Sequence, residues 1–77
     1  MRKHALLDHL TQKLGVKNDA QLSDYFEYRP TVFSKIRNRK MAISSNVILL
    51  IHEKTDMPVV EIRRLINESE REANEDK

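Results

Sequence analysis

The chain contains the segment Gln21-Leu-Ser-Asp-Tyr-Phe-Glu-Tyr-Arg-Pro-Thr-Val-Phe-Ser-Lys-Ile-Arg-Asn-Arg-Lys40, in which two groups of apolar residues flank Pro30. The groups are Leu22, Tyr25 and Phe26, and then Val32, Phe33 and Ile36. Their i, i+3, i+4 spacing places each group on one face of a helix. Pro30 lacks a backbone N–H and disfavours a helical residue before it, so it suits a helix start. The segment therefore predicts two short helices set at an angle, the second from about Pro30 to Arg39.

The second predicted helix keeps its polar residues on one outward face. These residues are Arg29, Thr31, Ser34, Lys35 and Asn38, and each type can bind a phosphate or a base edge. From Tyr28 to Lys40 the net charge is +5, with no acidic residue. A solvated helix usually mixes both signs at i, i+4 spacing, so this pattern favours contact with DNA.

Length and composition restrict the class of protein. Seventy-seven residues provide one small core, and the absence of cysteine excludes disulfides and thiolate metal sites. A cysteine-free chain is compatible with a reducing compartment, so we expect a cytoplasmic protein. The N-terminal region lacks the apolar run of a signal peptide, and no stretch approaches the roughly 18 apolar residues of a membrane span.

The formal charge is divided along the chain. Residues 1–40 carry a net charge of +5, whereas residues 41–77 carry −3. Such a dipolar molecule would present its basic part to a polyanion, which affects orientation and association rate.

The remaining chain predicts three further helices and so an all-α, compact bundle of about five. The first should run from about Lys3 to Leu14 and end at Gly15. Asn18 and Gln21 form a capping box that opens the next helix, over about Asp19–Phe26. Arg37-Asn-Arg-Lys40 has no apolar anchor, which predicts a loop along a duplex backbone that includes Arg39 and Lys40.

The acidic half supplies the last two predicted helices. Ser44 caps the fourth helix, whose residues Val47–Ile51 are apolar nearly all round, so we expect it at the buried centre and ending near Lys54. Pro58 opens the fifth, which should end at Ile66. The chain then divides into a helix-turn-helix domain over residues 1–66 and an acidic tail over residues 67–77, frayed or disordered.

This plan resembles the lambda-repressor-like DNA-binding domains of phage and bacterial transcriptional regulators, over about Leu6 to Ile66. Ser23 stands where that family usually has alanine at a close helix contact, and Thr55-Asp-Met-Pro-Val-Val-Glu-Ile62 is similar to the start of its fifth helix. The resemblance implies that Arg29, Pro30, Thr31, Ser34, Lys35 and Asn38 face DNA, and that Gln21 binds a phosphate. The family prefers glycine in the turn, where this chain has Glu27, so we expect a longer turn or an altered angle.

A regulator of this kind would bind double-stranded DNA as a homodimer, because one short helix reads only about 4 base pairs. The expected dimer contacts are Val59, Val60, Ile62 and Ile66, since this stretch is more apolar than one stripe requires. Neither a cofactor nor a small-molecule ligand is implied.

Two other classes of function compete with DNA binding. An enzyme would have to use His4, His9 and His52 with scattered carboxylates, but no nucleophile, phosphate-loop or metal-binding motif is present, and His4 with Asp8 reads as a surface pair. A helical protein-binding module is the stronger alternative, with Tyr25, Tyr28 and Met41 around an apolar patch.

Overall fold

The computed structural model describes residues 3–75, which form five helices and no strand. The helices are α1 (Ala5–Leu14), α2 (Asp19–Phe26), α3 (Pro30–Arg37), α4 (Ser45–Thr55) and α5 (Val59–Glu75). The prediction of an all-α bundle of about five helices is confirmed.

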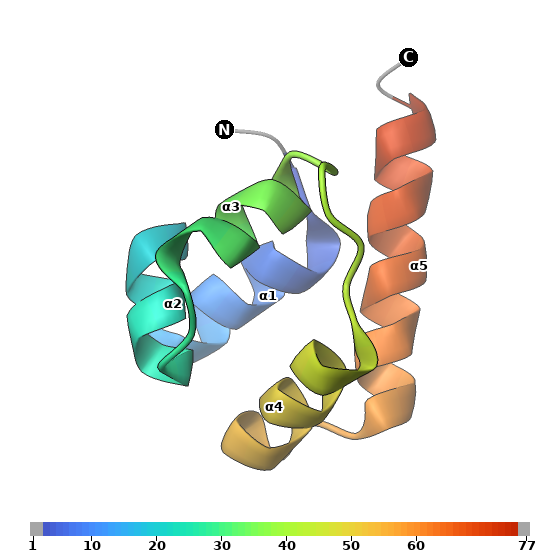
Figure 1. The fold of residues 1–77 in the computed structure, drawn as a ribbon. Coiled ribbons are helices and arrows are strands. Elements are labelled where there is room, and N and C mark those ends of the chain that lie inside the picture. The colour runs from blue at the N-terminus through green and yellow to red at the C-terminus, as the bar shows by residue number, and fades with distance from the viewer. Residues whose placement is uncertain (1–2, 76–77) are drawn as a thin grey trace.

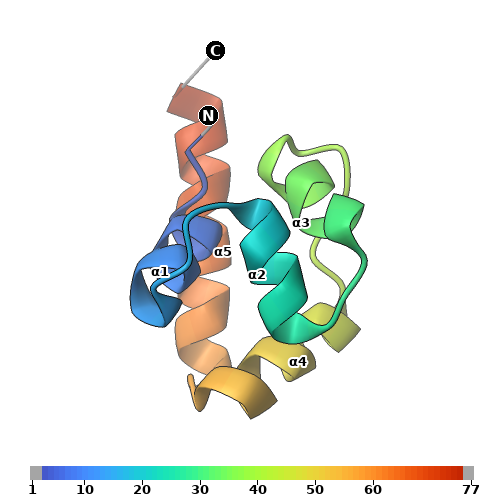
Figure 2. The same ribbon diagram turned by 90° about the vertical axis from the view of Figure 1, so that its left-hand side faces the viewer.

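The helices are arranged around α1 and α2. Helix α1 packs against α5, and α2 packs against both α1 and α3 (Figures 1 and 2). Helix α4 closes one end of the bundle by contacting α5 and α2. In Figure 1, α5 runs along one side of the molecule and continues beyond the level of α1.

The core lies where these helices meet. Its completely buried residues are Leu6, Leu10, Leu22, Phe33, Ile51 and Ile62. The rings of Phe26 and Phe33 stack with their centroids 5.6 Å apart, which joins α2 to α3. The apolar stripe predicted for α3 is confirmed, because Val32, Phe33 and Ile36 are all buried. In the stripe of α2, Leu22 and Phe26 are buried and Tyr25 is exposed.

Three helices end in the same hydrogen-bonded motif, at Gly15, Glu27 and Arg39, which all have a positive φ. After α2, the N–H of Tyr28 donates to the carbonyl of Ser23 at 2.9 Å, and the N–H of Glu27 donates to that of Asp24 at 3.1 Å. This is the Schellman pattern, which favours glycine at the left-handed position. Glu27 itself takes the left-handed conformation, with φ 54° and ψ 42°, and ends α2.

Two predicted helix ends differ from the structure. Helix α1 begins at Ala5 and not Lys3, because His4 is its N-cap. Helix α3 ends at Arg37 and not Arg39, because Arg39 adopts the left-handed conformation that closes it.

The prediction that α4 occupies the buried centre is wrong. Only Val47 and Ile51 of this helix are buried, and Leu49 is half exposed. The helix lies at one end of the bundle (Figure 1). Although nearly all of Val47–Ile51 is apolar, α4 packs on the core from one side and is not surrounded by the other helices.

The acidic segment after Ile66 extends α5. Residues 67–75, predicted as a frayed helical extension or a disordered tail, continue α5 without a break, which agrees with the first alternative in being helical. Ser69 within this segment is buried, because it follows Ile62 and Leu65 on the inward stripe of the helix. The part of the predicted tail at residues 76 and 77 lies outside the described residues, as do residues 1 and 2 of the predicted domain.

Glu27→Gly should stabilise the protein by about 1 kcal/mol, because glycine adopts the left-handed conformation without the steric cost of a Cβ. Gly15→Ala is the matched opposite change. A Cβ at Gly15 would meet nothing within 4 Å, so the loss of about 1 kcal/mol expected there is due to the backbone alone. Urea unfolding monitored by circular dichroism measures both. Equal stability of Glu27→Gly and Glu27→Ala would contradict this explanation.

Candidate nucleic-acid interface

The outward face of α3 gathers most of the residues predicted to contact DNA. Six of them lie on this helix or at its ends and are all exposed: Arg29, Pro30, Thr31, Ser34, Lys35 and Asn38. Lys40, just beyond the helix, is also exposed. The amide of Asn38 donates to the carbonyl of Ser34 at 3.0 Å, which leaves its carbonyl oxygen on the surface as an acceptor. The face is therefore polar and accessible.

The inward face of α3 fixes this orientation. Val32, Phe33 and Ile36 enter the core, and Arg37 joins them with only 3% of its surface exposed. Because both sets of residues are placed by one helix, the buried side chains determine which residues face solvent.

Arg37 forms ion pairs with two other helices. Its Nη1 lies 2.7 Å from Asp8 Oδ1 of α1, and its Nε lies 2.8 Å from Asp19 Oδ2 of α2. Burial opposes the charge, but the hydrogen bonds to Asp19 and Asp8 outweigh it and raise the pKa of Arg37. The prediction that Arg37 begins a loop along DNA is wrong, because its guanidinium group holds α1, α2 and α3 together.

The beginning of α2 lies in a hydrogen-bonded turn. Asn18 Oδ1 accepts from the N–H of Gln21 at 2.9 Å, and Gln21 Oε1 accepts from the N–H of Lys17 at 2.8 Å. These bonds confirm Asn18 as the cap. They also occupy the Gln21 carbonyl oxygen and leave its exposed amide NH2 as a donor, which is the group that a phosphate requires.

Ser23 brings α2 close to α3. Ser23 is completely buried. Its hydroxyl donates to the carbonyl of Asp19 at 3.0 Å, and the carbonyl of Pro30 is a second acceptor at 3.4 Å. A small residue is needed here because the backbone of α3 lies within hydrogen-bond range.

Arg39 is held within the protein. Its Nη2 donates to the carbonyl of Ser69 at 2.8 Å and to that of Lys3 at 3.1 Å, and its Nη1 donates to that of Arg37 at 3.4 Å. The residue thus joins the end of α3 to α5 and to the chain before α1. These three bonds fix the guanidinium group between α3, α5 and the chain before α1, so it is not free to move to the phosphate predicted for it.

The accessible positive charge is smaller than the sequence indicates. Of the five basic residues between Tyr28 and Lys40, Arg37 is buried and Arg39 binds carbonyl groups. Arg29, Lys35 and Lys40 remain, and none of them forms an ion pair with a described residue. Glu27 is exposed in the turn before Arg29 and places one negative charge near this face.

His4 also has a role that the sequence did not reveal. It is 3% exposed, and its Nδ1 accepts from the N–H of Leu7 at 3.4 Å, so it caps α1. The N–H of His4 in turn donates to Asp8 Oδ2 at 3.2 Å. Burial, with Arg39 and Arg37 nearby, lowers the pKa of His4 to about 4. The interpretation of His4 and Asp8 as a surface pair is wrong, because the imidazole is buried.

The predicted dimer contacts are dispersed by the structure. Ile62 is completely buried in the core, so it is not available to a partner. Ile66 packs against the core, and Val59 is half-buried. Val60 is 76% exposed, and it is the member of this set that remains on the surface.

Periodicity could have identified two of the residues that were missed. Arg37 is four residues after Phe33, and Ser69 is seven residues after Ile62, so both continue buried stripes. Their polarity concealed this position. His4 offered no such signal, because histidine is not among the preferred N-cap residues.

Residues 3–75 contain no group of three or more His, Cys, Asp or Glu side chains placed to hold a metal ion. None of the helices in that range is long and apolar enough to cross a membrane. No protein-family model, curated protein or solved structure matches the chain.

Arg37→Met should lower the free energy of unfolding by about 3 kcal/mol, because it leaves the largely buried Asp19 without its partner. Arg37→Met combined with Asp19→Asn should recover part of this loss. Lys35→Met on the exposed face is the control, with an expected change within about 0.5 kcal/mol. If urea unfolding shows equal effects for Arg37→Met and Lys35→Met, Arg37 does not join the helices as described.

His4 should make the protein less stable in mild acid. Its pKa falls from an ordinary 6.5 to about 4 on folding, so between these values the unfolded chain binds a proton that the folded chain does not. Stability should therefore fall as the pH drops from about 6.5 to about 4, by at most about 1.4 kcal/mol per pH unit. His4→Asn, which keeps a capping side chain, should lose this dependence, and the exposed control His9→Asn should keep it. Identical pH profiles of the two variants would contradict the assignment.

Proposed function

We propose that the protein is a sequence-specific DNA-binding transcriptional regulator that inserts α3 into the major groove. The observation that carries this proposal is the outward face of α3, on which Thr31, Ser34, Lys35 and Asn38 lie exposed while the opposite face is fixed in the core. An α-helix with its side chains is about 10–12 Å in diameter, so α3 can enter the major groove, which is about 12 Å wide. In this proposal α2 and α3 form a helix-turn-helix.

The surroundings of this face suit the phosphate backbone. Arg29 and Lys40 lie near the two ends of α3 and supply positive charge without a described partner. Gln21 offers an amide donor at the start of α2. No side chain caps α3, so the positive end of its dipole is open to an anion. Phosphate contacts of this kind set the position of the protein on the duplex, and Lys35 and Asn38 would read bases.

Specificity then requires two copies of the chain. One such helix contacts about 4 base pairs, so a homodimer reading half-sites about one helical turn apart is part of the proposal. The exposed Val60 remains the candidate for its interface. Occupancy of the operator would block or recruit polymerase, and we place the protein in the cytoplasm, where its DNA would be.

The first experiment measures fluorescence anisotropy of random DNA duplexes with the protein across a salt series and then sequences the retained duplexes. The proposal predicts steep salt dependence, because phosphate contacts release counterions, and enrichment of a roughly palindromic motif. Absence of binding at low salt would contradict it. The alternative function, a helical protein-interaction module, would then be favoured. It requires an exposed apolar patch, and Tyr25, Tyr28 and Met41 are exposed.

Lys35→Ala should weaken binding, by about 1 to 3 kcal/mol if Lys35 reads a guanine. This loss should be confined to one base position of the retained motif. Lys54→Ala removes the same charge from the exposed end of α4 and serves as the matched control. Arg29→Ala should instead weaken all duplexes alike and reduce the salt slope by about 0.9, the effect of one phosphate contact. If Lys35→Ala and Lys54→Ala weaken DNA binding equally, α3 is not the DNA-binding surface.

A further inference from the structure

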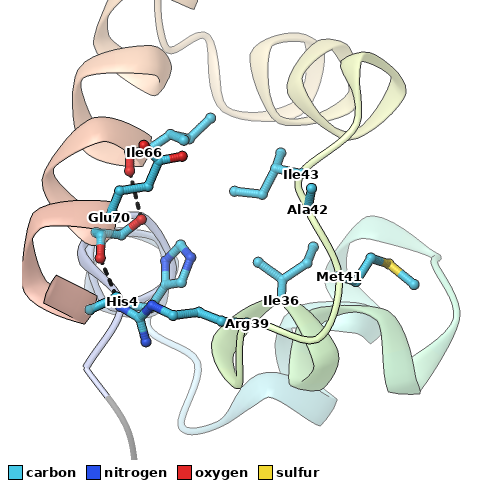
Figure 3. Close-up of a pocket in the computed structure, with 10 residues that line it drawn as sticks. His4, Ile36, Arg39, Met41, Ala42, Ile43, Ile66 and Glu70 are labelled. Atoms are coloured by element: carbon cyan, nitrogen blue, oxygen red, sulfur yellow. Dashed lines mark hydrogen bonds between the residues drawn. The ribbon is translucent and has the colours of Figure 1, made fainter. Parts of the chain in front are cut away.

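A groove of about 420 Å³ lies between the last turns of α5 and the chain that joins α3 to α4. Figure 3 shows its two walls. Ile36 and Ile43 face the groove from one side, and Ile66 lies across from them on α5. His4 and Arg39 lie together at one end. The groove therefore combines apolar walls with a polar end, as small-molecule sites commonly do.

His4 brings an unused hydrogen-bond donor to this groove. Its Nδ1 accepts from Leu7, so the neutral ring carries its proton on Nε2. His4 is only 3% exposed, yet its Nε2 has no hydrogen-bond partner among the described residues. The Nε2 atom also keeps some surface accessible to solvent. Because His4 lines the groove, a ligand in the groove can accept from this donor (Figure 3).

Arg39 adds positive charge at the same end. Both hydrogens of its Nη2 and one of its Nη1 bind carbonyl groups. Arginine has five N–H donors, so the Nε–H and one Nη1–H have no acceptor among the described residues. The guanidinium group is held in place by three elements of the fold, which means that a ligand would not have to order it.

We propose that this groove binds a small carboxylate with an apolar body, its carboxylate at His4 and Arg39 and its body between Ile36, Ile43 and Ile66. Charge decides the class of ligand. A neutral imidazole N–H and a guanidinium group both donate, so they select an acceptor and exclude an amine. The Glu70 carboxylate lies beside Ile66 in Figure 3, where it repels an anion, so the ligand carboxylate belongs at the end formed by His4 and Arg39.

This site does not depend on the proposed DNA binding, and it can be tested with the protein alone. Hexanoate is the probe, hexanamide is its neutral control and acetate is the control without an apolar body. The imidazole proton resonances of His4 report binding, with the exposed His9 and His52 as internal references. Hexanoate should shift the His4 resonances saturably, with a dissociation constant in the millimolar range expected for so small a ligand. It should bind at least about tenfold more tightly than hexanamide.

A second signature comes from the protonation of His4. A bound anion beside the ring favours the imidazolium, so saturating hexanoate should raise the pKa of His4 from about 4. The charged groups around His4 are Arg39, Arg37, Asp8 and Asp19, and these are unchanged by the ligand. Hexanamide and acetate should leave this pKa where it is.

Two variants locate the probe. Ala73→Leu adds apolar bulk to the lining of the groove without touching the core, and it should weaken hexanoate binding at least about tenfold. His4→Asn keeps a capping side chain but removes the Nε2–H, and it should weaken hexanoate binding more than hexanamide binding. Binding to Ala73→Leu is followed by the His4 resonances, and binding to His4→Asn is followed by backbone amides of residues 66–73.

Three results would overturn the proposal. The first is no shift of the His4 resonances at about 10 mM hexanoate. The second is an equal shift of His4, His9 and His52, which indicates unspecific association with the surface. The third is unchanged hexanoate binding by a folded Ala73→Leu variant, which places the ligand elsewhere.

Discussion

The ion pairs of the buried Arg37 guanidinium group are the interaction on which the arrangement of α1, α2 and α3 depends. A charge that is 3% exposed is costly unless it is paired, and here Asp8 of α1 and Asp19 of α2 supply the partners. These contacts fix how the last turn of α3 sits on two other helices. Phe33 fixes the middle of the same helix by stacking on Phe26. Rotation of α3 about its axis would break both, so its polar face has one orientation.

Arg39 extends this constraint to the C-terminal helix. The chain leaves α3 through a left-handed residue, and the side chain of that residue binds carbonyl groups of Lys3 and Ser69. The end of the proposed recognition helix, the cap of α1 and the last turns of α5 are thus neighbours. A ligand in the adjoining groove would contact all three.

Sequence patterns predicted most of the helices because their ends carry local signals. Helix caps form contacts with residues only a few positions away, so they can be recognised locally. The structure has the predicted caps at Gly15, Asn18 and Ser44. The exposed face of α3 followed from the spacing of Val32, Phe33 and Ile36.

The sequence failed where a polar residue is satisfied by a distant partner. Arg37 pairs with residues 18 and 29 positions away, and Arg39 binds residues 30 and 36 positions away. Such distant partners cannot be seen in the sequence, so both residues were interpreted as surface charges, although Arg37 continues the buried stripe of α3. The segment after Ile66 was predicted as a frayed helical extension or a disordered tail because it lacks large apolar residues, but the polar Ser69 continues the buried stripe of α5.

The central claim is that the outward face of α3 binds DNA, and nuclear magnetic resonance can test it residue by residue. The measurement is the change in the backbone amide spectrum when a duplex is added at low salt. The account predicts that the largest changes map to Thr31, Ser34, Lys35 and Asn38, and that added salt reverses them. Changes concentrated around Leu49 and Val60, with α3 unaffected, would contradict it.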